Sequence, residues 1–201
     1  SNRVYSLGGT GILNCLDLAT GQRIWWKDTI QDNQSHVNEW GVSCSPLVFD
    51  EFVVVSAGGR NGRSLVAYHK ATGEFAWGGG DHGAGYSSPA LATLAGVRQI
   101  LNFNSAGVAA HAVDSGNVLW DYAWPRGHPH VAQPLVLPND RVLVASGYGT
   151  GSELLQIQKD ERWSATRLWR SNRLKPKFTN LIHLDGYIYG LDDGIMVCLD
   201  A

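Results

Sequence analysis

Two histidines in the stretch RGHPH at 126–130 have a spacing that could support chemistry. In an extended segment, His128 and His130 would lie on the same side of the chain and could face one metal ion. No carboxylate or cysteine stands beside them in the sequence, so a solvated loop is the favoured interpretation. We therefore predict no metal site from this motif.

The glycine-rich stretch GGGDHGAGY at 78–86 resembles a loop that wraps a phosphate group. Such a loop is followed by a helix whose N-terminus attracts the anion, and no helical pattern follows here, so a flexible connection is favoured. Asn38, Glu39 and Asp81 carry oxygen atoms of the type that calcium prefers, but no spacing singles them out.

The three cysteines, Cys15, Cys44 and Cys198, are odd in number and match no metal-ligand spacing. Cys15 and Cys198 occupy the same position of an internal repeat as Ala67, which favours small core residues over reactive thiols. Lys175 and Lys177, in RLKPKF, are predicted to be exposed.

The composition narrows the class of protein. With 201 residues, 44% hydrophobic and 17% charged, the chain can bury a substantial core. Its net charge is -2 and no basic run stands out, which argues against a nucleic-acid partner. No apolar run reaches the roughly 18 residues of a membrane span. The 24 glycines and 8 tryptophans favour short strands joined by tight turns.

A turn followed by a tryptophan recurs along the chain, and this repeat must position the loops above. It reads LDLATGQRIWW at 16–26, KATGEFAW at 70–77 and VDSGNVLW at 113–120, with the glycine four residues before the tryptophan each time. A second marker, SPLV, SPAL and QPLV, places prolines at 46, 89 and 134, and Asn180 stands at the next such position. The motif residues are Asp17, Gly21, Trp25, Gly73, Trp77, Gly116, Trp120 and Trp169.

Each repeat unit reads as four short antiparallel strands, at the spacing of the blades of a β-propeller. We predict an all-β propeller forming one domain over 1–201, less than a tenth of it helical. The predicted blades are 43–77, 86–120 and 131–169, with partial blades at 1–26 and 178–201. The tryptophans should lie on outer strands, mostly buried between blades, and the glycines should give each turn a positive φ.

The pattern CLDLATGQRIW, with AYHKATGEFAW, AVDSGNVLW and the start CLDA, resembles the pyrroloquinoline-quinone-like propeller repeat of the quinoprotein alcohol dehydrogenase-like superfamily. The resemblance covers essentially the whole chain. The repeat itself begins and ends inside a unit, so we expect about four blades and a chain that is part of a longer protein. A closed four-bladed ring is possible in principle, but we favour an incomplete arc of the seven- or eight-bladed ring that the resemblance implies. The resemblance also implies a periplasmic or secreted location.

The resemblance leaves two functions open, because the same fold hosts enzymes and scaffolds. The first is a non-catalytic module that binds a protein, peptide or glycan. The alternative is a quinoprotein alcohol dehydrogenase, which the family implies would hold pyrroloquinoline quinone and Ca²⁺ and carry adjacent cysteines. No Cys-Cys pair occurs here.

Variation among the repeats concentrates in the connections from one blade to the next, which should share one face of the propeller. Function more often lies on variable loops carried by a rigid scaffold. We therefore expect a ligand-binding face formed by His36, Trp40, His82, Tyr86, His128 and His130. Scattered loop residues are the alternative interpretation.

Overall fold

The computed structural model describes residues 2–201 as strands, turns and one short helix. Eighteen strands form five antiparallel sheets, and in each sheet the spatial order of the strands follows their order in the sequence. The helix α1 (Thr29–Asp32) has four residues and begins at Asp28, whose carboxylate accepts from the Ile30 and Gln31 amides. The predictions of an all-β fold and of very little helix are confirmed.

The sheets are numbered along the chain. The first contains β1 (Arg3–Leu7), β2 (Ile12–Asp17) and β3 (Arg23–Asp28), and the second contains β4 (Leu47–Phe49), β5 (Phe52–Ser56), β6 (Leu65–His69) and β7 (Phe75–Gly79). The third contains β8 (Ala90–Leu94), β9 (Val97–Phe103), β10 (Gly107–Ala112) and β11 (Val118–Ala123). The fourth contains β12 (Leu135–Leu137), β13 (Arg141–Ser146), β14 (Gly151–Lys159) and β15 (Trp163–Ser171), and the fifth contains β16 (Ile182–Leu184), β17 (Tyr187–Asp192) and β18 (Ile195–Asp200).

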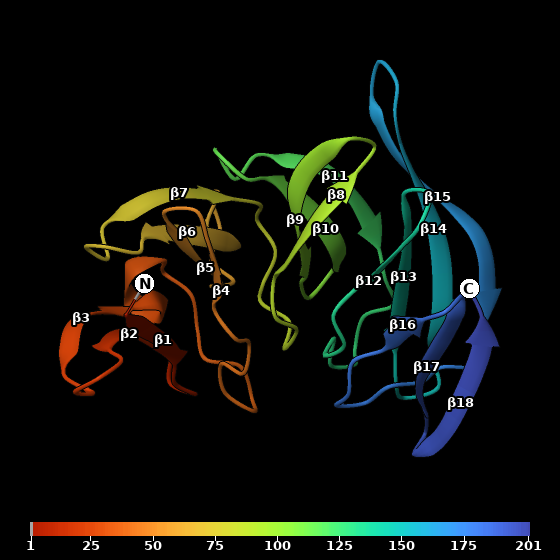
Figure 1. Ribbon diagram of the computed structural model, residues 1–201, viewed down its shortest axis with the longest axis horizontal. Coiled ribbons are helices and arrows are strands. Elements are labelled where there is room, and N and C mark those ends of the chain that lie inside the picture. The colour runs from red at the N-terminus through yellow and green to blue at the C-terminus, as the bar shows by residue number, and fades with distance from the viewer. Residues whose placement is uncertain (1) are drawn as a thin grey trace.

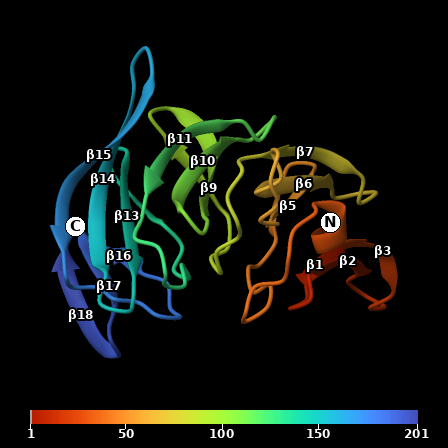
Figure 2. The ribbon, with the colours of Figure 1, turned by 180° about the vertical axis from the view of Figure 1, so that it is seen from behind.

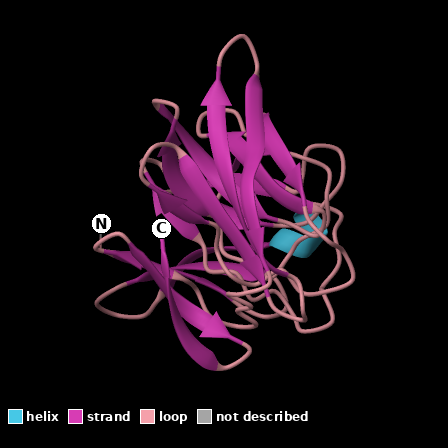
Figure 3. Cartoon of the chain, turned by 90° about the vertical axis from the view of Figure 1, so that its right-hand side faces the viewer, coloured by secondary structure: helices cyan, strands magenta, loops and turns pink. Residues whose placement is uncertain are grey.

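The sheets follow one another around an open arc that does not close into a ring (Figure 1). The view from behind shows the same succession, with the first and fifth sheets at opposite ends of the arc (Figure 2). The hairpin between β14 and β15 extends well beyond the other hairpins (Figure 1), in the unit that lacks the turn glycine. The helix lies among the loops at one side of the sheets (Figure 3).

The repeated tryptophans occupy equivalent positions on outer strands, as predicted. The four tryptophans on β3, β7, β11 and β15 are Trp25, Trp77, Trp120 and Trp169. Each of them pairs with a residue of the strand before it, and the pairing register shifts directly after that residue. Such a shift is a β-bulge, which re-aims the side chains beside it. Trp25, Trp77 and Trp120 are buried, whereas Trp169 is partly buried.

The turn glycines of the second and third sheets, Gly73 and Gly116, each lie under the tryptophan of the preceding sheet. A Cβ atom on Gly73 would lie 2.8 Å from Cδ2 of Trp25, and one on Gly116 would lie 2.6 Å from Cε3 of Trp77. Both glycines have φ near +75°, which residues with side chains rarely adopt. The glycine therefore meets two demands at once: the backbone of its own turn, and the ring that locks the neighbouring sheet against it.

The aspartate and threonine of the motif shape the turn itself. Asp17 accepts hydrogen bonds from the backbone amides of Ala19 and Thr20 and from the Thr20 hydroxyl, at 2.8–3.0 Å. These bonds favour the ionised carboxylate, and they lower the pKa of Asp17, with the Thr20 amide as the largest cause.

The core lies between consecutive sheets, and the cysteines follow from that arrangement. Cys15 is fully buried between the first and second sheets. Cys198 occupies the equivalent repeat position but is exposed, so its predicted place in the core is wrong. The physical reason is that, among residues 2–201, no further sheet packs against that face of the fifth sheet.

Candidate functional site

The connections from one sheet to the next touch each other in chain order on one side of the arc. Asn38 Nδ2 donates to the Ala84 carbonyl at 3.1 Å, joining the connection after β3 to the connection after β7. The Tyr86 amide donates to the His130 carbonyl at 2.8 Å, joining the latter to the connection after β11. These bonds bring loops more than 40 residues apart into one surface.

The centre of this surface is an apolar hollow of about 340 Å³. It is lined by Trp40, Ser43, Tyr86, Pro129, Val131 and Phe178, which come from four successive connections. The Trp40 and Tyr86 rings lie 5.5 Å apart and tilted by 48°. Trp40 is 61% exposed and Phe178 is 75% exposed, so large apolar surfaces face solvent here. Contiguous exposed apolar surface of this kind marks binding sites.

A second hollow of about 280 Å³ adjoins the first and shares Trp40, Tyr86 and Pro129 with it. Its other walls include the polar side chains of Asn38, Glu39, Ser105 and His128. The two hollows together form a site with an apolar lobe and a polar lobe. We call this the loop-face site.

The two histidines of RGHPH have different environments. The His128 ring stacks on Tyr148, with centroids 5.5 Å apart and planes 3° apart. His130 is buried, stacks on Phe103, and has both ring nitrogens within 3.0 Å of carbonyl oxygens. Its interpretation as a solvated loop residue is therefore wrong, because Phe103 of β9 stacks on its ring and the loops after β9 and β11 place two carbonyl oxygens beside it. Both of its ring nitrogens therefore face carbonyl oxygens inside the protein, those of Asn104 and Pro125.

The structure brings four of the six predicted face residues to the loop-face site: Trp40, Tyr86, His128 and His130. His82 lines a smaller hollow of about 130 Å³ with Asp121, Tyr122 and Arg126. His36 lines a fourth hollow of about 290 Å³ with Arg60 and Asn61. The six residues therefore share a side of the arc but not one cavity.

Sequence reasoning missed Val131 and Phe178, although the repeat contained a signal for the first. Ser43, Tyr86 and Val131 each stand three residues before the proline that opens an inner strand. They occupy the same repeat position, and all three line the apolar lobe. Phe178 departs from this rule, because Lys177 stands at that position in its connection.

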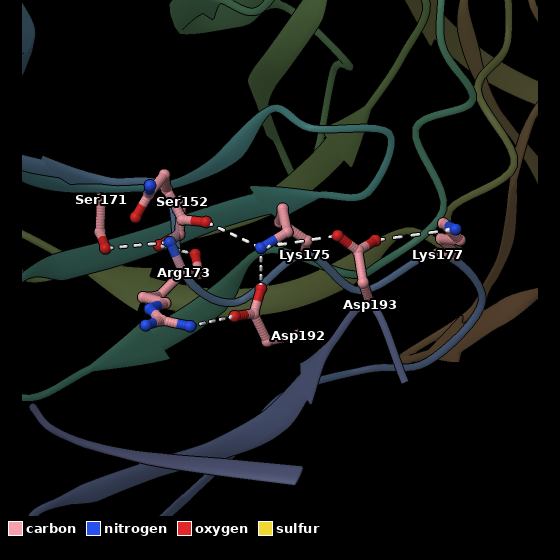
Figure 4. Close-up of polar contacts among 8 residues, drawn as sticks. Ser152, Ser171, Arg173, Lys175, Lys177, Asp192 and Asp193 are labelled. Carbon is pink, nitrogen blue, oxygen red and sulfur yellow. Dashed lines mark hydrogen bonds and ion pairs between the residues drawn. The ribbon is translucent and has the colours of Figure 1, made fainter. Parts of the chain in front are cut away.

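A network of ion pairs holds the connection that carries Phe178 (Figure 4). Lys175 Nζ contacts the carboxylates of Asp192 and, at 3.5 Å, of Asp193, while Arg173 contacts Asp192 at 3.1 Å. Lys177 lies 3.7 Å from Asp193. The Lys175 side chain is only 17% exposed, so its prediction as an exposed residue is wrong, because the turn between β17 and β18 folds acidic groups against it.

The network sets the charge state of its members. The hydrogen bond from Lys175, followed by that from Arg173, lowers the pKa of Asp192. The same bond to Asp192 raises the pKa of Lys175. Both groups are therefore charged at neutral pH, and the connection at 172–181 is tied to the β17–β18 turn.

The oxygen donors of the described chain do not fit a calcium and quinone pair. Among residues 2–201, no three His, Cys, Asp or Glu side chains gather at one point. Asn38 and Glu39 line the polar lobe, but the Asp81 carboxylate accepts from the Gly62 amide instead. The three cysteines are free, and none is adjacent to another in sequence. Over the same residues, no helix has the length and apolar character needed to cross a bilayer.

Comparison with known proteins gives a match along the whole chain. The PQQ_2 family model, described as outer membrane protein assembly factor BamB, matches residues 1–201. No curated protein sequence matches the chain.

Solved structures show the same architecture. BamB from Moraxella catarrhalis is 19% identical with a TM-score of 0.67, covering 100% of this chain and 56% of that one. Quinohemoprotein alcohol dehydrogenase from Comamonas testosteroni is 14% identical with a TM-score of 0.63, covering 99% and 40%. The enzyme ADHIIG from Pseudomonas putida HK5 is 16% identical with a TM-score of 0.52, covering 94% and 41%. The chain thus spans about half the length of the structures it matches.

Proposed function

We propose that this chain, which belongs to the PQQ_2 family of β-propeller proteins, is a non-catalytic binding or scaffold module that docks a protein partner at the loop-face site. One observation carries the proposal. Four successive connections, bonded to one another, present exposed aromatic and apolar side chains around a single hollow. Aromatic side chains of this kind anchor protein interfaces.

The lining of the apolar lobe favours a protein or peptide over a glycan. Apart from the phenol of Tyr86, the only hydroxyl group that lines this lobe belongs to Ser43. That hydroxyl already donates to the Tyr86 carbonyl at 3.4 Å. A sugar carries hydroxyl groups that need hydrogen-bond partners when they are buried, whereas an apolar side chain does not. The polar lobe, with Asn38, Glu39 and His128, would accept the backbone or polar groups that flank such an anchor.

The relatives support a location outside the cytoplasm for this module. One related structure is an outer membrane protein assembly factor by name, and a scaffold role in an assembly fits a site built for protein contact. The finer assignment to the periplasm or to a secreted protein is part of the same proposal.

The alternative function is a quinoprotein alcohol dehydrogenase, which the structural likeness to two quinohemoprotein enzymes favours. The donor set described above does not fit that cofactor pair within this chain. Residues elsewhere in a longer protein would have to supply it.

The docking proposal is tested by placing a photo-crosslinking amino acid at Phe178 in the full-length protein within cells. We expect a discrete protein adduct at this position. A matched control places the same group at Leu18, which is 62% exposed in a β2–β3 turn at the other end of the strands. Adducts of equal yield at both positions, or none at Phe178, would contradict the proposal.

A second variant separates binding from folding. Trp40→Ala should reduce the crosslink at Phe178 several-fold while leaving the urea midpoint of unfolding unchanged, because Trp40 is mostly exposed. The enzyme alternative is assayed with pyrroloquinoline quinone, Ca²⁺ and an artificial electron acceptor. Alcohol-dependent dye reduction by the full-length protein would overturn the non-catalytic assignment.

A further inference from the structure

Buried polar atoms without a hydrogen-bond partner gather at one interface of the arc. Among residues 2–201, seven buried side-chain nitrogen or oxygen atoms have no partner within the protein. Six of them belong to residues at the interface between the second and third sheets: Ser56 Oγ, Ser64 Oγ, Trp77 Nε1, both amide atoms of Asn102, and His111 Nε2.

The strand geometry places these groups in one layer. Val54 of β5 and Ile100 of β9 belong to one buried cluster that spans the interface. Alternate residues of a strand lie on the same face. Ser56 and Asn102 follow these two residues by two positions, so they face the same interface. His111 pairs with Ile100 in the third sheet and therefore points the same way. A Cβ atom on Gly80 would lie 3.1 Å from the His111 ring and 3.2 Å from Ser64, which brings Ser64 to the same place.

The other interfaces are apolar at the equivalent positions. Asn102 and His111 of the third sheet correspond to Val144 and Leu155 of the fourth, which belong to an apolar cluster. Ser56 corresponds to Phe103 in the third sheet and Ala145 in the fourth. The repeat can therefore form an apolar interface. The interface between the second and third sheets instead carries polar side chains from both sheets.

A dry interface with these groups would be costly, because each buried donor or acceptor without a partner loses its hydration. The Asn102 amide needs both a donor and an acceptor, and Trp77 Nε1 needs an acceptor. His111 Nδ1 lies 2.8 Å from the Gly116 carbonyl, so in the neutral ring it carries the hydrogen and leaves Nε2 as an acceptor. Water is the small ligand that can donate and accept at such a point.

We infer that the interface between the second and third sheets is a binding site for ordered water molecules, held by Ser56, Asn102 and His111. The site lies beneath the beginning of the connection at 80–89, since Gly80 borders both Ser64 and His111. That connection also carries Tyr86 of the loop-face site.

The test is a crystal structure of the protein at a resolution that shows ordered water. We expect water within hydrogen-bonding distance of the Asn102 amide and of at least one of Ser56 Oγ and His111 Nε2. A well-ordered interface without water, or an Asn102 amide bonded directly to protein groups, would overturn the inference. This result does not depend on whether the loop-face site binds a partner.

A second test replaces polar residues of this interface by the apolar residue types found at the equivalent positions of the other interfaces, and measures stability as well as bound water. The double substitution Ser56→Ala and Asn102→Val should abolish the water peaks and leave the urea midpoint equal or higher, because both orphaned groups are removed together. Val144→Asn, at the equivalent position of the apolar interface, is the matched control and should lower the midpoint. A double variant that is destabilised as much as Val144→Asn would contradict the inference.

Discussion

Replacing turn glycines by alanine separates two roles that the repeat motif combines. Gly21, Gly73 and Gly116 all have φ between +70° and +75°, so alanine meets the same backbone cost at each. Their surroundings differ. A Cβ atom at Gly21 meets nothing within 4 Å in this chain, whereas at Gly73 and Gly116 it would collide with Trp25 and Trp77. The difference between the variants in free energy of unfolding therefore measures the effect of the contact between tryptophan and glycine.

The magnitudes follow from these contacts. A left-handed backbone costs a residue with a Cβ about 1–2 kcal/mol, which is the whole loss expected for Gly21→Ala. Forcing an extra methyl group into a packed core costs a further ~1–3 kcal/mol. At Gly73 the neighbour is a ring at 2.8 Å, and at Gly116 the methyl group also meets the Gly78 backbone at 2.9 Å. We therefore expect Gly116→Ala to lose at least as much stability as Gly73→Ala, and both to lose more than Gly21→Ala.

The assay is urea denaturation of the three variants and the parent protein, followed by tryptophan fluorescence and by circular dichroism. The free energies of unfolding should rank parent, Gly21→Ala and then the other two, with similar dependence on urea. Equal losses at Gly21 and Gly73 would mean that the glycine serves its own turn alone. The idea that each turn is a seat for the neighbouring tryptophan would then be refuted.

Three further predictions concern titration and exposure. Burial lowers the pKa of His111, so the unfolded chain binds its proton first and stability should fall as pH drops below about 6.5; His111→Leu should remove this part of the pH dependence of unfolding. The pKa of Asp192 is also lowered, so its contribution is present above about pH 3.8 and lost as pH falls through the folded value; Lys175→Met should shift the acid unfolding midpoint upward, and more than Lys177→Met. In the native 201-residue chain a thiol reagent should modify Cys198 at once and the buried Cys15 and Cys44 only on unfolding, as mass spectrometry of labelled peptides will show.

The fixed spacing of residues within the repeat explains which features of the fold could be predicted from the sequence. A fixed spacing between glycine and tryptophan specifies one strand register, so the outer position of Trp77 follows without any knowledge of the neighbours. The same phase fixes which connections share a side of the arc. It also contains the equivalence of Ser43, Tyr86 and Val131, which a stricter use of the proline marker would have recognised.

Burial that depends on distant partners could not be predicted in the same way. Lys175 is partly covered by acidic residues that follow it by 17 and 18 positions, in a turn whose direction no local pattern reveals. His130 is buried because Phe103 of the third sheet offers its ring face and Asn104 offers its carbonyl. Both interactions arise from how sheets and loops meet, and a repeat alignment contains no information on that.

The inner ends of the connections explain how variable loops can form one defined surface. The Ser45 amide donates to the Ser88 hydroxyl at 2.8 Å, Gln133 Nε2 donates to the Ser88 carbonyl at 3.2 Å, and the Gln133 amide donates to Asn180 Oδ1 at 2.9 Å. Each of these residues lies at or beside the position of the repeat proline, so the bonds recur from sheet to sheet at the start of the inner strands. This series of hydrogen bonds holds the last residues of these connections in register, whatever the length of the loop before them. Side chains three positions earlier can then change without loss of the scaffold, which is the arrangement that a binding surface of adjustable specificity requires.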